Sequence, residues 1–414
     1  MNIKLRLTIL NFLEFFAWGA WLLSAGAYMY NTLQFSGVQI GAVYATLGIA
    51  SVFMPAIMGI IADRWLNAEK LFGFSHIILS VLLILVAQVT DYQTFYLVVF
   101  LVSMFYMPTI ALNNAISYSI LETNKFNIVK AFPPIRVWGT IGFIAAVWLV
   151  DLLGWKLSKE QFYVSALASL ILGIYSFTLP ACPPAKIENK TLLQRFGLDA
   201  FVLFKERKMA IFFIFSMLLG ASLQITNIWG VEFLNNFGNI DIYKDSFAVT
   251  RSGILMSLSQ ISETVFILAI PFFLYKFGIK TVMLISMFAW VLRFALFGIG
   301  NPGTGLSFLI LSMLIYGIAF DFFNISGSLF VEKEAKPGIR SSAQGLFMLM
   351  TNGLGAIIGA LSSGFVVDYF TVGGVKDWQT IWFTFALYSL IVAIGFAITF
   401  KYKHDPNSIS TIKH

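Results

Sequence analysis

The sequence is poor in the residues from which disulfides, metal sites and soluble surfaces are built. Its 414 residues include one cysteine, Cys182, and three histidines, His76, His404 and His414. A single cysteine excludes an intramolecular disulfide framework, and such low counts argue against a cysteine or histidine metal cluster. Charged residues make up only 11% of the chain, whereas a soluble domain carries about 25%. The chain is therefore predicted to be an integral membrane protein.

Apolar residues dominate instead, at 58% of the chain, and the mean hydropathy is +0.83. A helix needs about 20 apolar residues to cross the hydrocarbon. Twelve segments have that character, which predicts an all-α fold, and the stretch after Lys4 and Arg6 is interpreted as a retained first helix rather than a cleaved signal peptide. The expected spans are residues 8–30, 38–62, 71–90, 94–119, 132–153, 161–180, 209–231, 252–275, 281–299, 305–330, 341–367 and 379–400.

The longest polar stretch divides these spans into two sets of six. We expect an N-terminal six-helix half over 1–182, a cytoplasmic linker over 183–208, and a C-terminal six-helix half with a short cytoplasmic tail over 209–414. Residues 192–204 are amphipathic enough to lie on the membrane as a helix, although a plain tether fits equally well. With both termini cytoplasmic, 20 of the 27 basic residues lie inside, five lie outside, and Arg136 and Arg293 lie in spans. This asymmetry obeys the positive-inside rule, and it explains the net charge of +7 without a nucleic-acid partner.

Polar residues inside the spans indicate a transport path, because ionisable groups in hydrocarbon are costly and usually face a ligand or water. In the expected fifth span, Pro133 and Pro134 suit a helix start. Arg136, Thr140 and Phe143 then recur at a spacing that places them on one helix face, which suits a polar ligand with a flat ring. The alternative for Arg136 is a cation that snorkels toward lipid headgroups.

Further candidates lie in the second half. Gln224 with Asn227, and Gln260 with Glu263, are each three residues apart and so neighbours on a helix. Amide and carboxyl groups offer the paired donors and acceptors that a nucleobase edge or sugar hydroxyls require, although interhelical hydrogen bonding is the alternative. The expected tenth span adds three candidates. Tyr316 and Phe320 could stack on a base, and Asp321 could bind a proton.

Three acidic residues within spans, Glu14, Glu263 and Asp321, are candidates for proton coupling, because desolvation and nearby cations shift the protonation of a carboxyl group. Arg293 is a candidate counter-ion for one of them or a member of a structural ion pair. No nucleotide-binding loop, catalytic triad or metal-ligand spacing is present in the sequence, so neither an ATP-driven pump nor an enzyme is expected.

Two sets of motifs carry a family resemblance. Gly59, Asp63 and Arg64 match the Gly-x-x-x-Asp-Arg signature of the major facilitator superfamily, although Leu66 and Asn67 depart from it. Their expected role is to steady one conformation. The segments PPIRVWGTIGF, MAIFFIFSMLLGASLQITN, ISETVFILAIPFF, LRFALFGIG and YGIAFDFFNISGSLFVEKE resemble the nucleoside:proton symporter family of that superfamily.

The resemblance implies the major facilitator fold and proton-coupled import of nucleosides across the bacterial inner membrane by alternating access, by a monomer with no cofactor other than the proton. Asp321 is implied in coupling or conformational change. One position departs from the family, since Glu14 stands where a glutamine is expected. The implied substrate contacts are Arg136, Thr140, Phe143, Gln224, Asn227, Gln260, Glu263, Tyr316 and Phe320.

Three alternatives stay open at this point. The chain could be a permease for another polar solute, such as a nucleobase or a sugar. It could also be a membrane sensor that binds nucleosides without transporting them. Sodium could replace the proton as the coupling ion, although no cluster of carboxylate and carbonyl ligands marks a sodium site.

Overall fold

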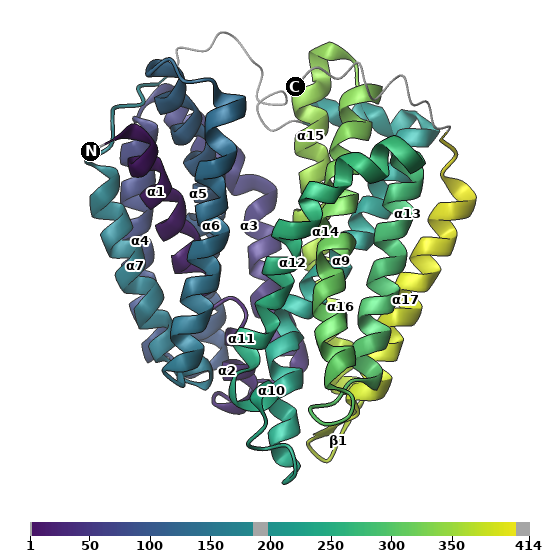
Figure 1. The fold of residues 1–414 in the computed structure, drawn as a ribbon. Coiled ribbons are helices and arrows are strands. Elements are labelled where there is room, and N and C mark those ends of the chain that lie inside the picture. Colours follow the sequence, from purple (N-terminus) through teal and green to yellow (C-terminus); the bar gives the residue numbers. More distant parts are fainter. Residues whose placement is uncertain (1, 185–197, 403–414) are drawn as a thin grey trace. The chain divides into compact units, whose positions relative to one another are not determined.

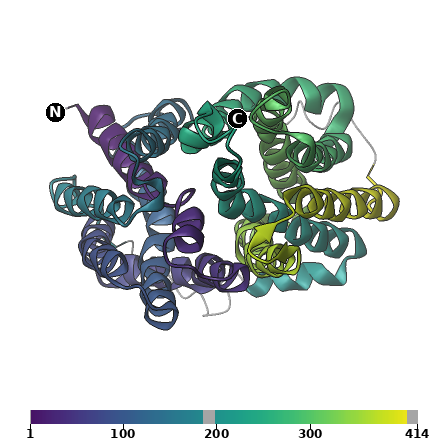
Figure 2. The ribbon, with the colours of Figure 1, turned by 90° about the horizontal axis from the view of Figure 1, so that it is seen from below.

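The computed structural model describes residues 2–184 and 198–402, and these residues are almost entirely helical (Figure 1). One antiparallel hairpin, formed by β1 (Thr371–Val372) and β2 (Val375–Lys376), is the exception among them. The chain separates into two compact units, Met1–Arg195 and Phe196–His414. Seen from below, the helices of each unit run close to end-on and pack together as a bundle (Figure 2). Helices satisfy their own backbone hydrogen bonds, as a chain in hydrocarbon requires.

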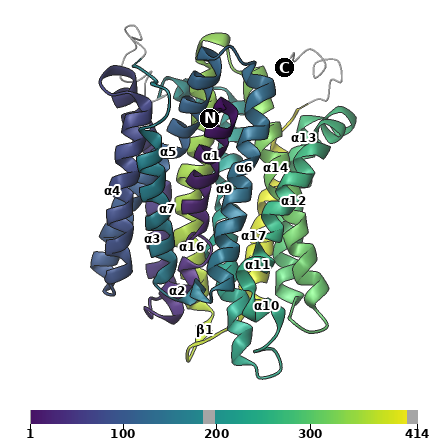
Figure 3. The same cartoon turned by 60° about the vertical axis from the view of Figure 1, so that its left-hand side comes forward.

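The first unit is built from long helices joined by short turns. Within it, α1 packs along α6, α3 along α5, and α4 along both α7 and α5; α4 and α7 are seen side by side in Figure 3. Its elements are α1 (Ile3–Gly19), α2 (Ala25–Asn31), α3 (Gly37–Arg64), α4 (Ala68–Gln88), α5 (Tyr92–Thr123), α6 (Ile128–Leu152), η1 (Trp155–Leu157) and α7 (Glu160–Ser176).

The second unit contains more interrupted helices. In it, α13 packs against α14 and α17, α12 against α14, and α9 against η6, α16 and α17. Its elements are η2 (Leu198–Lys205), α9 (Arg207–Asn236), η3 (Phe237–Asn239), α10 (Phe247–Thr250), α11 (Ser252–Met256), α12 (Leu258–Phe266), η4 (Ile267–Ala269), α13 (Ile270–Ile299), α14 (Leu306–Glu334), η5 (Pro337–Ile339), α15 (Arg340–Met348), η6 (Leu349–Gly355), α16 (Ala356–Tyr369), β1, β2 and α17 (Trp378–Thr399).

Polar caps fix where several of these helices begin. The backbone N–H of Gln39 donates to the Ser36 hydroxyl at 3.2 Å, and the Ser36 N–H donates to the Gln39 side chain at 2.9 Å. This capping box satisfies two donors that the first turn of α3 would otherwise leave free. Asp91 caps α5 in a simpler way, accepting from the Thr94 N–H at 2.9 Å.

The predicted membrane fold is confirmed. Nine helical stretches among the described residues are long and apolar enough to cross a membrane, and one of them, Ser252–Ile299, has 48 residues and covers two expected spans. The helices α1 and α7, of 17 residues each, overlap the expected first and sixth spans. Together these elements account for the twelve predicted spans.

Exposed apolar side chains form stripes that suit contact with lipid. On α17, the last helix in Figure 1, Leu387, Ile391, Ile394 and Ile398 recur on one face, and all are exposed. Such a stripe is apolar surface that packing within the unit leaves uncovered. Lipid tails are the environment that this surface requires.

The expected continuous first span over 8–30 is wrong. The chain turns between α1 and α2, at residues 20–24. The Tyr44 hydroxyl of α3 donates to the Leu22 carbonyl at 2.6 Å and accepts from the Gly26 N–H at 3.0 Å. Backbone groups released by the turn are thus satisfied by a buried side chain, which is how a membrane protein tolerates a broken helix.

Other expected boundaries also need correction. Pro133 and Pro134 do not start α6, because that helix begins at Ile128 behind an Asn127 cap and contains both prolines. The expected loop between the eighth and ninth spans is instead a kink, at which Gly278 has φ 77° and ψ 167°. Only glycine adopts that conformation without strain.

Two further segments differ from the predictions. The eleventh span contains a π-helix, η6, between α15 and α16. In the linker, the described part of the predicted interfacial helix over 192–204 is the 3-10 helix η2, and the rest of that prediction lies outside the described residues.

Candidate functional site

In the first unit, the predicted face of α6 lies against α1. The Arg136 guanidinium sits 4.1 Å above the centre of the Phe15 ring, and the side chain is half-buried. One turn later Thr140 is half-buried too, and Phe143 is buried. A guanidinium that stacks on an aromatic ring is held in a fixed orientation. This contact argues against a freely snorkelling Arg136 side chain.

Glu14 is fully buried and faces a histidine that the sequence analysis missed. Its Oε2 lies 2.8 Å from Nε2 of His76 on α4, and both side chains are completely inaccessible. The Thr109 hydroxyl of α5 donates to Oε1 at 2.8 Å. Glu14 is therefore held by an imidazole and a hydroxyl inside the helix bundle.

In the second unit, the predicted aromatic residues form a wall on α14. The rings of Tyr316 and Phe320 stack with centroids 5.6 Å apart and planes 7° from parallel. Trp290 of α13 meets the Tyr316 ring edge-on at 6.0 Å. Tyr316 is buried, whereas Phe320 is half-buried, so Phe320 is the ring of this pair on which a planar heterocycle could stack.

The expected ion pair of Arg293 is wrong. No carboxylate of the described residues lies within ion-pair distance of this fully buried side chain; its guanidinium instead lies 4.7 Å from the centre of the Tyr316 ring. It donates to the Ser312 carbonyl at 2.8 Å and to the Ser259 hydroxyl at 3.2 Å. Arg293 thus fixes the position of Tyr316 through a cation–π contact.

The two acidic candidates of this unit lie near the same tyrosine. Gly317 of α14 lets α12 approach, since a Cβ atom there would lie 2.6 Å from the Ser262 carbonyl oxygen. Tyr316 is within electrostatic reach of both Glu263 and Asp321, and the two acids reach one another. Asp321 is buried, with one carboxyl oxygen lacking a hydrogen-bond partner in the described part of the chain. Because the two acids interact, the protonation of one affects the protonation of the other.

The predicted amides lie on two helices. Gln224 on α9 is buried, whereas Asn227 and Gln260 are half-buried. The side-chain oxygen of Gln260 on α12 is buried and has no hydrogen-bond partner among the residues that the structure describes. Because an unsatisfied buried acceptor is costly, Gln260 is suited to receive a hydrogen bond from a ligand.

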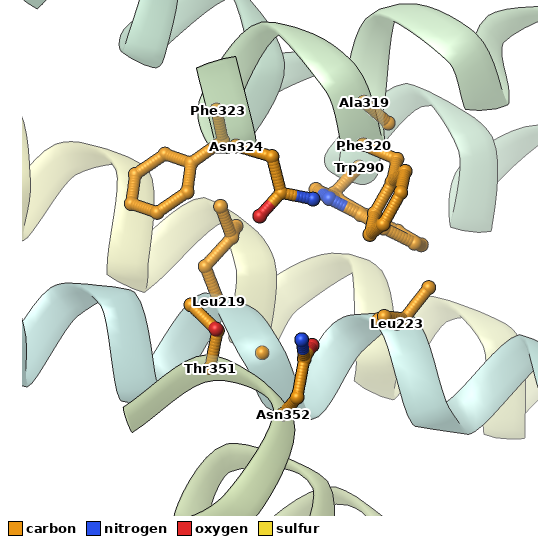
Figure 4. A pocket seen from close by; sticks show the side chains of 10 residues that line it. Leu219, Leu223, Trp290, Ala319, Phe320, Phe323, Asn324, Thr351 and Asn352 are labelled. Carbon is orange, nitrogen blue, oxygen red and sulfur yellow. The ribbon is translucent and has the colours of Figure 1, made fainter. Parts of the chain in front are cut away.

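A small pocket opens within the second unit beside the aromatic wall. Asn324 of α14 and Asn352 of η6 extend their amides toward it from opposite sides, and Leu219 and Leu223 of α9 also line it (Figure 4). At Gly220 a Cβ atom would lie 2.2 Å from the Thr351 carbonyl oxygen, so a glycine is what lets η6 come close to α9. The remaining lining residues are Gly220, Trp290, Ala319, Phe320, Phe323 and Thr351.

The structure thus adds residues that the sequence analysis did not assign. His76 is a histidine inside a predicted span, and that alone was a signal. Asn352 lies in a π-helix, an irregularity common at functional sites, but nothing in the sequence marks it. By contrast, Asp63 and Arg64 lie exposed at the end of α3, without an ion pair to any described residue.

Comparison with known proteins supplies the family. The model of the family described as Nucleoside H+ symporter matches residues 1–405. Nucleoside permease NupG of Escherichia coli (strain K12) is 54% identical over 418 residues, covering 100% of both chains. Xanthosine permease of the same organism is 54% identical over 411 residues, covering 99% of this chain and 98% of its own.

Solved structures agree. A crystal structure of the nucleoside transporter NupG, with 55% sequence identity, superposes with a TM-score of 0.92 and covers 97% of this chain and 100% of its own. The POT family transporter PepTSo, at 14% identity and a TM-score of 0.71 over 100% of this chain and 99% of its own, shares the fold alone. With the major facilitator fold established, the chain belongs to the nucleoside H+ symporter family.

Proposed function

We propose that this protein imports nucleosides together with protons by alternating access. The observation that carries the proposal is the parallel Tyr316 and Phe320 wall with Glu263 and Asp321 beside it. The half-buried Phe320 ring of this wall offers stacking to a base, and the acids offer a proton site. Family membership and the names of the two 54% identical permeases support the same substrate class.

The substrate contacts are proposed residue by residue. Arg136, with its ring contact to Phe15, offers two or more oriented N–H donors to a polar ligand. Gln260 offers a buried acceptor. The full proposed set is Arg136, Thr140 and Phe143 in the first unit, and Gln224, Asn227, Gln260, Glu263, Tyr316 and Phe320 in the second.

For the proton, Glu263 and Asp321 are the proposed carriers at the substrate contacts, and Glu14 is a further carrier considered below. Protonation of one acid would change the charge beside Tyr316 and so the hydrogen bonds on offer to substrate. Arg293 is proposed to hold Tyr316 through the cycle, while Asp63 and Arg64 are proposed to steady one conformation.

The proposed setting is the bacterial inner membrane, with both termini in the cytoplasm and the protein working as a monomer. The distribution of basic residues supports this orientation through the positive-inside rule. The two six-helix halves are proposed to be residues 1–182 and 209–414, joined by the linker 183–208. The proton is the proposed coupling ion, with no further cofactor.

Uptake of labelled uridine, adenosine and xanthosine into cells that lack their own nucleoside permeases tests the proposal. We expect accumulation that collapses with a protonophore, and competition by nucleosides but not by free uracil or ribose. Glu263→Gln should abolish accumulation, while Glu122→Gln, which changes an exposed acid of α5, should leave it intact. Binding without accumulation would instead identify a sensor, and resistance to the protonophore would exclude proton coupling.

A further inference from the structure

Within residues 2–184 and 198–402, each unit contains one ion pair whose two side chains are both fully buried. These pairs are Glu14 with His76 and Glu232 with Lys376, each at 2.8 Å. They differ in chemistry, because histidine is the side chain that changes charge between about pH 5 and 8, whereas a paired lysine keeps its charge. Of the two, the first pair is therefore the one that contains a side chain suited to changing its charge in that range.

The Glu14 carboxylate joins three helices. Oε2 faces His76 of α4, and Oε1 accepts from Thr109 of α5 at 2.8 Å. The Tyr106 hydroxyl, also on α5, donates to the Glu14 backbone carbonyl at 3.1 Å. The His76 ring lies against Phe72, with centroids 4.5 Å apart. Neither of its ring nitrogens has a hydrogen-bond partner among the described residues, so its contact with Oε2 is a close ion-pair distance. The pair is tied to α1, α4 and α5 together.

Other titratable groups facing the pair are few. Tyr106 of α5 is within electrostatic reach of Glu14 and of Arg136 on α6. Helix α7 faces α1 with a hydroxyl, that of Ser165, which donates to the Ala17 carbonyl at 2.7 Å. Glu69, two turns before His76 on α4, is occupied by the Cys182 N–H at 2.8 Å. The carboxylate and the imidazole are thus the groups in direct contact.

Gain or loss of a proton here changes the charge of a sealed site. A proton added to the ion pair neutralises the carboxylate and leaves an imidazolium without its partner. A proton lost from the ion pair leaves a carboxylate beside a neutral imidazole. An uncompensated charge in a protein interior is strongly unfavourable, so either event requires water to enter or the packed helices to move.

We propose that Glu14 and His76 form a second proton-binding site, inside the first unit, that couples protonation to the packing of α1 against α4 and α5. The site is separate from the acids of the second unit, Glu263 and Asp321. This inference deepens the proposed function, and its transport readout rests on that function. The ligand of the site is the proton itself.

The test is uridine uptake as a function of external pH between about pH 5 and 8. Glu14→Gln and His76→Gln each remove one member, and a glutamine at position 14 still accepts from Thr109. We expect both variants, and the double variant, each to change the ratio of rates across this range by about fivefold or more. The control Glu122→Gln should follow the wild type. Profiles of Glu14→Gln and wild type that superimpose would overturn the proposal.

A second measurement does not depend on transport. The purified full chain, carrying isotope-labelled histidine, is titrated by nitrogen NMR, and His76→Gln identifies which of the three signals belongs to His76. We expect that signal to titrate, and Glu14→Gln to move its midpoint. A His76 signal that stays constant from about pH 5 to 8 would refute the inference. A protein that titrates as expected but accumulates no nucleoside would refute the proposed function instead.

Discussion

The buried ion pair of the second unit gives a quantitative test of how this unit is held together. Lys376 extends from the β1–β2 hairpin, and its Nζ lies 2.8 Å from Glu232 of α9, with both side chains completely inaccessible. The ammonium also lies 5.6 Å from the centre of the Trp378 ring. We consider Lys376→Met, Glu232→Gln and the double variant.

Removal of one partner leaves the other as a buried charge without its main partner, which costs about 3–5 kcal/mol. For a domain of this size, about 1 kcal/mol corresponds to roughly 2–4 °C in Tm. Lys376→Met is therefore expected to lower the Tm by about 6–20 °C. The double variant leaves no unpaired charge and should be more stable than Lys376→Met alone.

Thermal unfolding of the purified protein in detergent measures these differences. The matched control is Lys244→Met, because Lys244 and Asp241 form a pair at 3.8 Å that is open to solvent and contributes little to stability. If Lys376→Met unfolds within the range of the control, or if the two single effects simply add in the double variant, the reasoning is refuted.

Three further predictions concern single positions. Asn352→Leu should lower the rate constant of nucleoside uptake, measured from initial rates, by about threefold to tenfold. This is the value of one hydrogen bond lost between the Asn352 amide in the pocket and the nucleoside. Gly220→Ala forces Thr351 away and should cost about 1–3 kcal/mol in thermal unfolding, whereas Gly345→Ala, which meets no atom within 4 Å, should not. Burial raises the pKa of the Cys182 thiol to about 11, so maleimide should label it slowly at neutral pH and faster as the pH rises.

The number of spans could be predicted from the sequence because hydropathy sums over whole helices. Local breaks could not, since they depend on single backbone contacts. Residues 20–24 are as apolar as their neighbours, and the turn there is supported by Tyr44 from another helix. The kink at Gly278 could not be predicted either, because a glycine in an apolar run is compatible with a loop, a kink or a straight helix.

The sequence predicts which residues of the candidate site are unusual, but it does not predict which residues they contact. Polar groups in spans identified Arg136, Glu14 and Arg293 as unusual, but the sequence cannot say what faces them. Arg293 meets the ring of Tyr316 rather than a carboxylate, and Glu14 meets His76. Both partners come from other helices, so only the fold brings them together.

Proton movement that accompanies nucleoside movement tests the central claim most directly. The purified protein is placed in sealed lipid vesicles without any imposed gradient, and uridine is added while the external pH is followed. We predict that uridine entry makes the external medium more alkaline, and that Glu263→Gln abolishes this change. Entry of labelled uridine with no change in external pH would contradict the account.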